Sequence, residues 1–298
     1  MSRPAYFLLV LVFCLSWSSA FPTAKLALTV APPLLYLGVR FSIAAILLVG
    51  FAMVTGRGRT DGKKCVPWLT LMGLGVINFA FYQGMVWLGM RTVSGGLTTI
   101  ITSLNPVLVS CLAAPVLGEK LTWRKFAGLV LGFAGAAFVV RNRVAIGEDL
   151  GGIGLVGIGM VSLTIGTLLI KRLAPGLDLF ILTGAQQGGA GITLIVLGLA
   201  MGENFQQFVP GALLVETMLW FVFVVSIASF LLWFFLLRRG TAAAASSLHF
   251  LMPPLGLLMS WGLLGEPLHP IDLLGVIPVA IGIRLATTES VSRSAVKS

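Results

Sequence analysis

The sequence has few charged residues and very few of the side chains that most often perform catalysis. Only 10% of its residues are charged, and it has ten acidic residues, two histidines and three cysteines. Every acidic residue falls in an expected loop or at the end of an apolar run, and no two cysteines form a CxxC pair. Acid-base catalysis, nucleophilic triads and metal centres need such groups close together. We therefore expect neither an enzyme nor a protein that holds a metal or cofactor.

Apolar residues dominate the chain instead. They make up 57% of it, and the mean hydropathy is +1.02, values typical of integral membrane proteins. A hydrocarbon core about 30 Å thick needs about 20 apolar residues per helix. The sequence predicts an all-α polytopic membrane protein with ten transmembrane helices, at residues 5–28, 33–54, 66–90, 93–116, 123–141, 152–173, 178–201, 213–237, 241–264 and 269–287. The first run has some features of a signal peptide, but it continues past Ala20 as a full span.

The net charge of +10 would suggest a nucleic-acid partner in a soluble protein. Here the cations lie almost entirely in short loops, where they indicate orientation. With the amino terminus in the cytoplasm, fifteen Lys and Arg residues fall on the inner side, and four fall on the outer side: Lys25, Arg91, Arg141 and Arg143. We therefore expect both termini in the cytoplasm and no nucleic-acid partner.

A stretch of 32 residues, 104–135, is repeated 147 positions later at residues 251–282. Nine positions are identical, among them Pro106/Pro253, Glu119/Glu266, Gly128/Gly275 and Gly135/Gly282. The same offset runs without gaps from the first apolar run to the last. It predicts two five-helix repeats, at residues 1–143 and 148–288, and a cytoplasmic tail at 289–298. Because five is odd, the second repeat is inverted in the bilayer, an organisation typical of transporters with a site near the midplane.

Polar side chains recur at helical spacing within several of the apolar runs. Ser94, Thr98, Thr102 and Asn105 are spaced four, four and three residues apart, which places them on one helix face. A single hydroxyl can simply bond back to its own helix, but a whole stripe favours a solvated cavity. We predict a substrate site at Trp17, Asn78, Tyr82, Thr98, Thr99, Ser103, Asn105, Thr164, Ser226 and His249. For His249, a satisfied interior histidine and a proton-sensing cavity residue are equally open.

Three charged residues near the apolar runs are expected to have structural roles. Arg40 lies two turns inside the second run, and we expect it to snorkel or to pair with a carbonyl rather than to contact substrate. Glu119 and Glu266 stand at equivalent helix ends, where capping of the following helix is favoured over gating or proton coupling. With no acidic residue in the middle of a span, a carboxylate proton relay is disfavoured.

The Asn105-Pro106 pair, the Leu-Gly-Glu turns at 117–119 and 264–266, and the ten runs in two sets of five resemble the drug/metabolite transporter superfamily, specifically its EamA-type exporters. The resemblance covers essentially the whole chain and implies a transporter of the bacterial inner membrane. A closer likeness to amino-acid exporters implies outward movement of aromatic and other neutral amino acids. In the second half Met252-Pro253 replaces Asn-Pro, so the role of the asparagine cannot be carried over there.

We therefore predict an exporter that alternates access around a midplane cavity and moves amino acids down their gradient. Its expected partners are the solute and the lipid bilayer. Two alternatives stay open: an exporter of another small metabolite or drug, with or without proton coupling, and a membrane scaffold that transports nothing. The sequence leaves monomer and homodimer undetermined.

Overall fold

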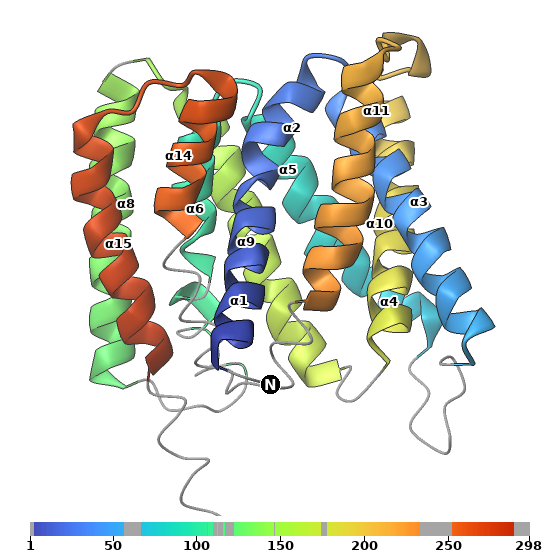
Figure 1. Ribbon diagram of the computed structural model, residues 1–298, viewed down its shortest axis with the longest axis horizontal. Helices are drawn as coiled ribbons and strands as arrows, with labels where there is room; N and C mark the ends of the chain where they lie inside the picture. Colours follow the sequence, from blue (N-terminus) through green and yellow to red (C-terminus); the bar gives the residue numbers. More distant parts are fainter. Residues whose placement is uncertain are drawn as a thin grey trace, which may run out of the picture. The chain divides into compact units, whose positions relative to one another are not determined.

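The computed structural model describes residues 3–56, 67–105, 107–109, 112, 116, 122–145, 147–173, 178–232 and 252–288. Within these residues every regular element is a helix, and no strand occurs (Figure 1). Seven spans among the described residues are long and apolar enough to cross a membrane: Leu11–Leu28, Pro33–Val54, Trp68–Gly89, Trp123–Ala145, Leu150–Ile170, Leu179–Ala200 and Ala212–Leu232. The all-α, multi-pass prediction is confirmed, while the count of ten helices stays a prediction.

Four of these spans consist of single helices: α3 (Pro33–Val54), α8 (Trp123–Ala145), α9 (Leu150–Leu173) and α10 (Leu179–Ala200). The shorter described helices are α6 (Gly95–Thr102), η2 (Phe205–Gln207) and α14 (Met252–Leu264), and α15 (Pro270–Thr288) closes the series. A helix of 22 residues is roughly 33 Å long, which matches the hydrocarbon thickness.

The other three spans are interrupted. The first consists of α1 (Arg3–Ser18) and α2 (Ala20–Leu28), because Pro22 has no N–H to donate to the Ser18 carbonyl. The third consists of α4 (Trp68–Gly75), the π-helix η1 (Val76–Phe81) and α5 (Tyr82–Gly89). The last begins with α11 (Ala212–Leu219) and continues as the π-helix η3 (Trp220–Ser229).

The chain divides into two compact units, and each takes helices from both halves of the sequence. Unit 1 comprises Met1–Lys25, Gly89–Gly157 and Leu232–Ser298, and unit 2 comprises Leu26–Leu88 and Ile158–Leu231. Each unit contains one pair of long helices that the 147-residue offset relates: α8 with α15 in unit 1, and α3 with α10 in unit 2.

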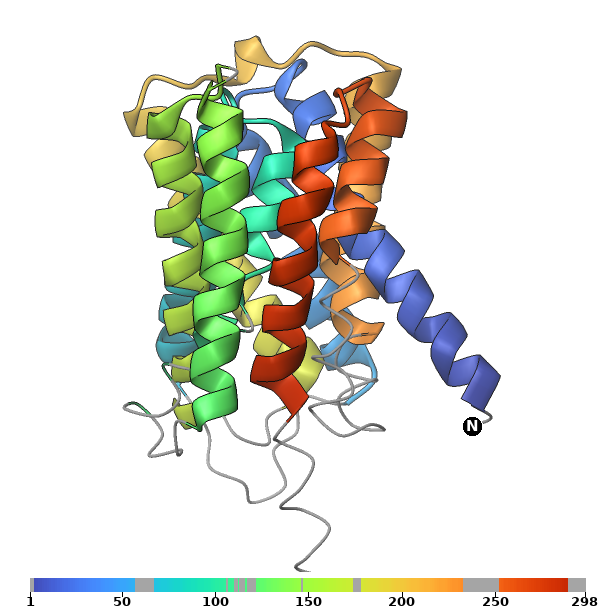
Figure 2. The same ribbon diagram turned by 90° about the vertical axis from the view of Figure 1, so that its left-hand side faces the viewer.

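In unit 1, α8 and α15 lie side by side and antiparallel (Figures 1 and 2). A Cβ on Gly135 would lie 2.7 Å from the carbonyl oxygen of Gly275, and a Cβ on Gly282 would lie 2.6 Å from that of Gly128. The offset converts the first contact into the second, so the two contacts are equivalent, as a two-fold axis between the helices requires. Backbone contact of this kind stabilises helix pairs in lipid, where no hydrophobic force drives them together.

In unit 2, α3 and α10 pack in the same close manner. A Cβ on Gly191 would lie 3.1 Å from the carbonyl oxygen of Gly38, and one on Gly184 would lie 2.7 Å from Cγ2 of Val49. Small residues at the crossing therefore bring the two backbones together. This approach positions the polar residues that the middle turns of both helices carry.

We predict that Gly135→Ala destabilises the protein by about 1–3 kcal/mol, because the new methyl group would overlap the backbone of α15. The matched control is Gly154→Ala in α9, where an added Cβ meets nothing within 4 Å and improves helix propensity. Thermal unfolding of the purified protein in detergent measures both. Equal melting temperatures for the two variants would contradict the close contact.

Candidate functional site

Two of the predicted site residues in unit 2 lie on π-helical segments. Asn78 belongs to η1 and Ser226 to η3. The 147-residue offset carries residues 76–81 onto 223–228, so η3 covers the repeat equivalent of η1. Segments of this kind are rare and occur frequently at functional sites. The sequence did not predict them, because apolar periodicity over so few residues does not separate π from α geometry.

Arg40 belongs to unit 2 and is fully buried, with 0% of its surface exposed. Its Nε donates to the Ser226 hydroxyl at 3.0 Å. The guanidinium carbon lies 4.7 Å from the ring centroid of Phe41 and 4.3 Å from that of Phe221. The prediction of snorkelling or carbonyl pairing is therefore wrong, because the side chain is held inside the unit by a hydroxyl and two aromatic faces.

The charge of Arg40 is only partly compensated by its neighbours. Nη1 and Nη2, which carry four of the five guanidinium N–H groups, have no hydrogen-bond partner among the described residues. Both ion pairs found among the described residues belong to Arg143, and neither involves Arg40. A desolvated cation–π contact contributes on the order of 2 kcal/mol, whereas each unsatisfied buried donor costs about 1–3 kcal/mol. The surroundings are therefore electropositive and favour an anionic group.

Buried amide oxygens without a partner lie in the same unit. Gln187, the repeat equivalent of Arg40, donates from Nε2 to the backbone oxygen of Ser226 at 3.2 Å, and its Oε1 is unpartnered. Asn78 donates to Oε1 of Gln186 at 3.1 Å, and its own Oδ1 is unpartnered. Unit 2 thus offers both unfilled donors and unfilled acceptors. We call Arg40, Asn78, Gln187 and Ser226 the polar centre of unit 2.

Aromatic rings lie beside Arg40 in this polar centre, and they contact further rings of unit 2. Tyr36 stacks on Trp87 with ring centroids 5.2 Å apart, and the ring of Phe221 lies 5.3 Å from that of Trp87. Phe41 meets Phe79 edge to face at 5.5 Å. The predicted site residues Tyr82 and Thr164 are also buried in this unit, and the Thr164 hydroxyl donates to the Met160 carbonyl of its own helix at 3.0 Å. Rings packed beside polar atoms suit a solute with an apolar body.

The hydroxyl stripe on α6 belongs to unit 1. Its hydroxyls bond back along the helix: Thr98 donates to the Ser94 carbonyl at 2.9 Å, Thr99 to Gly95 at 2.9 Å, and Ser103 to Ile100 at 2.7 Å. A hydroxyl whose proton is used in this way can still accept a hydrogen bond. The hydroxyls of Thr98, Thr99 and Ser103 therefore retain acceptor capacity alone.

Among the other predicted site residues of unit 1, Trp17 has apolar neighbours and Asn105 is only partly buried. Trp17 packs against the cluster of Phe13, Cys14 and Met252, so the methionine that replaces asparagine in the second repeat has an apolar role. Asn105 is half-buried. His249 lies outside the described residues.

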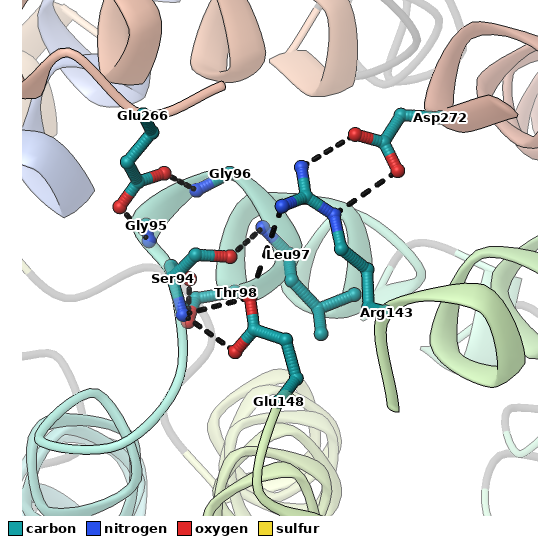
Figure 3. Close-up of polar contacts among 9 residues, drawn as sticks. All are labelled: Ser94, Gly95, Gly96, Leu97, Thr98, Arg143, Glu148, Glu266 and Asp272. Atoms are coloured by element: carbon teal, nitrogen blue, oxygen red, sulfur yellow. Dashed lines mark hydrogen bonds and ion pairs between the residues drawn. The ribbon is translucent and has the colours of Figure 1, made fainter. Parts of the chain in front are cut away.

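Two carboxylates hold the amino-terminal end of α6 (Figure 3). Glu266 accepts from the Gly95 N–H at 2.8 Å and from the Gly96 N–H at 3.1 Å. Glu148 accepts from the Ser94 N–H at 3.0 Å, and the Ser94 hydroxyl in turn accepts from the Leu97 N–H at 3.3 Å. The expectation that Glu266 caps the helix that follows it is therefore wrong: it caps a helix 170 residues earlier. Glu119 lies outside the described residues.

A buried ion pair joins the same network in Figure 3. Arg143 donates to both carboxylate oxygens of Asp272, with its Nε 3.1 Å from Oδ1, and its Nη1 lies 3.9 Å from Glu148. Arg143 was expected in an outer loop, but α8 continues to Ala145 and places it in the last turn, 4% exposed. This guanidinium is anchored on α15 by a carboxylate, in contrast to that of Arg40.

Asp149 precedes α9 and caps it from outside the span. Its Oδ2 accepts from the Gly152 N–H at 2.7 Å and from the Thr92 hydroxyl at 3.0 Å. The Gly152 bond is the main reason that the pKa of this carboxyl lies below its ordinary value. A lowered pKa adds stability above the unfolded pKa, and this stability is lost as the pH falls through the folded pKa. Because the carboxyl is exposed, solvent screens the effect.

Comparison with known proteins identifies related sequences along the whole chain. The model of the EamA-like transporter family matches residues 4–141 and 150–288. The uncharacterized transporter YvbV of Bacillus subtilis is 29% identical over 97% of this chain and 93% of its own length. The uncharacterized inner membrane transporter YedA of Escherichia coli is 26% identical over 91% of this chain and 87% of its own. One solved crystal structure covers 96% of this chain and 98% of its own, with a TM-score of 0.68 and 16% identity, which shows a shared fold.

We predict that Arg143→Gln destabilises the protein by roughly 3–5 kcal/mol, because it leaves the carboxylate of Asp272 buried and unpaired. Replacing both partners, Arg143→Met with Asp272→Leu, removes that cost and is expected to recover most of the stability. Chemical and thermal unfolding in detergent give the values for the single and double variants. A double variant as unstable as Arg143→Gln would show that the pair is not what holds α8 and α15 at this end.

Proposed function

Because the chain belongs to the EamA-like transporter family, we propose that it exports amino acids, aromatic and other neutral ones, across a bacterial inner membrane. Export proceeds by alternating access around a midplane cavity, the mode that an inverted repeat favours. Both termini lie in the cytoplasm in this proposal, as the distribution of Lys and Arg predicts. A transporter of this kind has no need of a cofactor.

The observation that carries the choice of solute is the pair of buried, unpartnered amide oxygens of Asn78 and Gln187 in an aromatic surrounding. Such oxygens accept hydrogen bonds from an ammonium group without introducing a charge. The neighbouring rings bury an apolar or aromatic side chain through offset and edge contacts. The likeness of the sequence to amino-acid exporters, noted above, implies the same class of solute.

Facilitated movement down the solute gradient fits the positions of the carboxylates. Each carboxylate in the described part of the chain lies in a loop or within the first two turns of a helix. Proton-coupled transporters commonly carry ionisable residues inside their spans, because a charge placed there is costly and is kept for function. We therefore propose that a proton gradient is not required.

The decisive experiment is efflux of labelled phenylalanine, threonine and methionine from liposomes that contain only the purified protein. We expect saturable efflux of all three, equally fast with and without a pH gradient. Protein-free liposomes are the control. Efflux that needs a pH gradient would refute facilitated transport, and no flux for any of the three would refute amino acids as the solute.

We further predict that Asn78→Leu lowers phenylalanine efflux by about 10- to 150-fold, because a lost hydrogen bond to a charged group costs about 1.5–3 kcal/mol. Asn142→Leu, at the end of α8 and bonded to its own helix, is the matched control and should keep the wild-type rate. Initial rates at several solute concentrations provide the comparison. Equal rates for both variants would remove Asn78 from the site.

A further inference from the structure

Arg40 is one of two arginines that are buried in the described part of the chain, and the pair differs in one respect. Arg143 has both oxygens of Asp272 as acceptors. Arg40 has the Ser226 hydroxyl on its Nε, while Nη1 and Nη2 have no hydrogen-bond partner in the described structure. A buried guanidinium without an anion is rare, because the loss of hydration is not repaid by contacts with rings alone.

The way Arg40 is held leaves a particular edge of the guanidinium unused. The Nε–H of Arg40 is used in the hydrogen bond to the Ser226 hydroxyl, and the rings of Phe41 and Phe221 lie against the guanidinium. The remaining edge carries Nη1 and Nη2 side by side. This edge of an arginine matches the two oxygens of a carboxylate through two parallel hydrogen bonds.

Ser226 connects this donor edge to an acceptor. Its hydroxyl accepts a hydrogen bond from Nε of Arg40, and its backbone oxygen accepts one from Nε2 of Gln187 at 3.2 Å. The Oε1 of Gln187 is buried and has no partner among the described residues. Arg40 and Gln187 occupy the same position in the two repeats, so one repeat supplies the donor and the other supplies the acceptor at a common residue. A donor edge and an acceptor oxygen together complement a zwitterion.

We propose that Arg40 is the residue that binds the carboxylate of the transported solute, so that the solute must carry a carboxylate group. The assignment rests on the proposed function and makes it more specific. Arg40 lies roughly 10 Å along α3 from its first residue, inside the span rather than at its end. A solute without a carboxylate leaves the charge of Arg40 uncompensated and is rejected for that reason.

The test uses the full-length purified protein and three probes that share one aromatic body. L-phenylalanine carries both charges, 3-phenylpropionate carries the carboxylate alone, and phenethylamine carries the ammonium alone. Thermal stabilisation in detergent gives their apparent affinities for the wild type and for Arg40→Gln, Arg40→Lys and Arg143→Gln. Efflux of labelled phenylalanine from liposomes is measured for the same four proteins.

We expect phenylalanine and 3-phenylpropionate to stabilise the wild type, and phenethylamine to do so far less. Arg40→Gln should weaken phenylalanine binding by about 10- to 150-fold, as expected for a hydrogen-bonded charge pair. Arg40→Lys keeps the charge but lacks the two parallel donors, so its affinity for phenylalanine should lie between those of the wild type and Arg40→Gln. Without solute, Arg40→Gln should melt no lower than the wild type, because it removes a buried, uncompensated charge.

Arg143→Gln is the control for a purely structural arginine. It should melt at a lower temperature and keep the wild-type preference for carboxylates. The proposal is overturned if Arg40→Gln binds phenylalanine as tightly as the wild type, or if it only loses stability, as Arg143→Gln does, and keeps the carboxylate preference. It is also overturned if neither phenylalanine nor 3-phenylpropionate stabilises the wild type.

The two proposals fail in different ways. In one outcome the wild type moves none of the labelled amino acids, and 3-phenylpropionate stabilises the wild type but not Arg40→Gln. This outcome would refute amino-acid export and uphold the carboxylate site. Saturable phenylalanine efflux that persists unchanged in Arg40→Gln would uphold export and refute the role of Arg40.

Discussion

The structure depends on one constraint: in a bilayer, a polar group that leaves its own helix must find a partner within the protein. The helix ends show how this is met. Glu203 accepts from the backbone N–H groups of Leu34 and Leu35 at the start of α3, and Glu266 does the same at the start of α6. Each carboxylate lies about 170 residues from the helix it caps, so these bonds stabilise tertiary contacts as well as helix ends.

Close helix packing is the second consequence of the lipid environment. Because lipid tails are as apolar as leucine, helix pairs gain little from burying apolar surface and rely on backbone approach. The glycines of α8 and α15 provide it in unit 1, and those of α3 and α10 provide it in unit 2. In both units the paired helices are related by the 147-residue offset. The scaffold therefore follows the duplication closely.

The polar side chains at equivalent positions of the two repeats are much less alike than the packing of the helix pairs. Arg40 and Gln187 are equivalent in the repeats and meet on the same serine, yet one is a cation and the other is neutral. Met252 stands where the first repeat has Asn105 and packs among apolar side chains. Divergence at a few polar positions therefore gives equivalent positions of the two repeats different hydrogen-bonding groups.

The sequence by itself determined the helical class and the multi-pass character, because apolar runs of about 20 residues leave few alternatives in water or lipid. Its repeated motifs, such as the Leu-Gly-Glu turns at 117–119 and 264–266, indicated the family. It could not place Arg143 or Glu266, because their partners are between 129 and 171 residues away. Only the tertiary structure decided that Arg143 is paired with Asp272 and that, among the described residues, Nη1 and Nη2 of Arg40 have no partner. Whether a charge is compensated depends on which distant side chains surround it, and local periodicity carries no information about them.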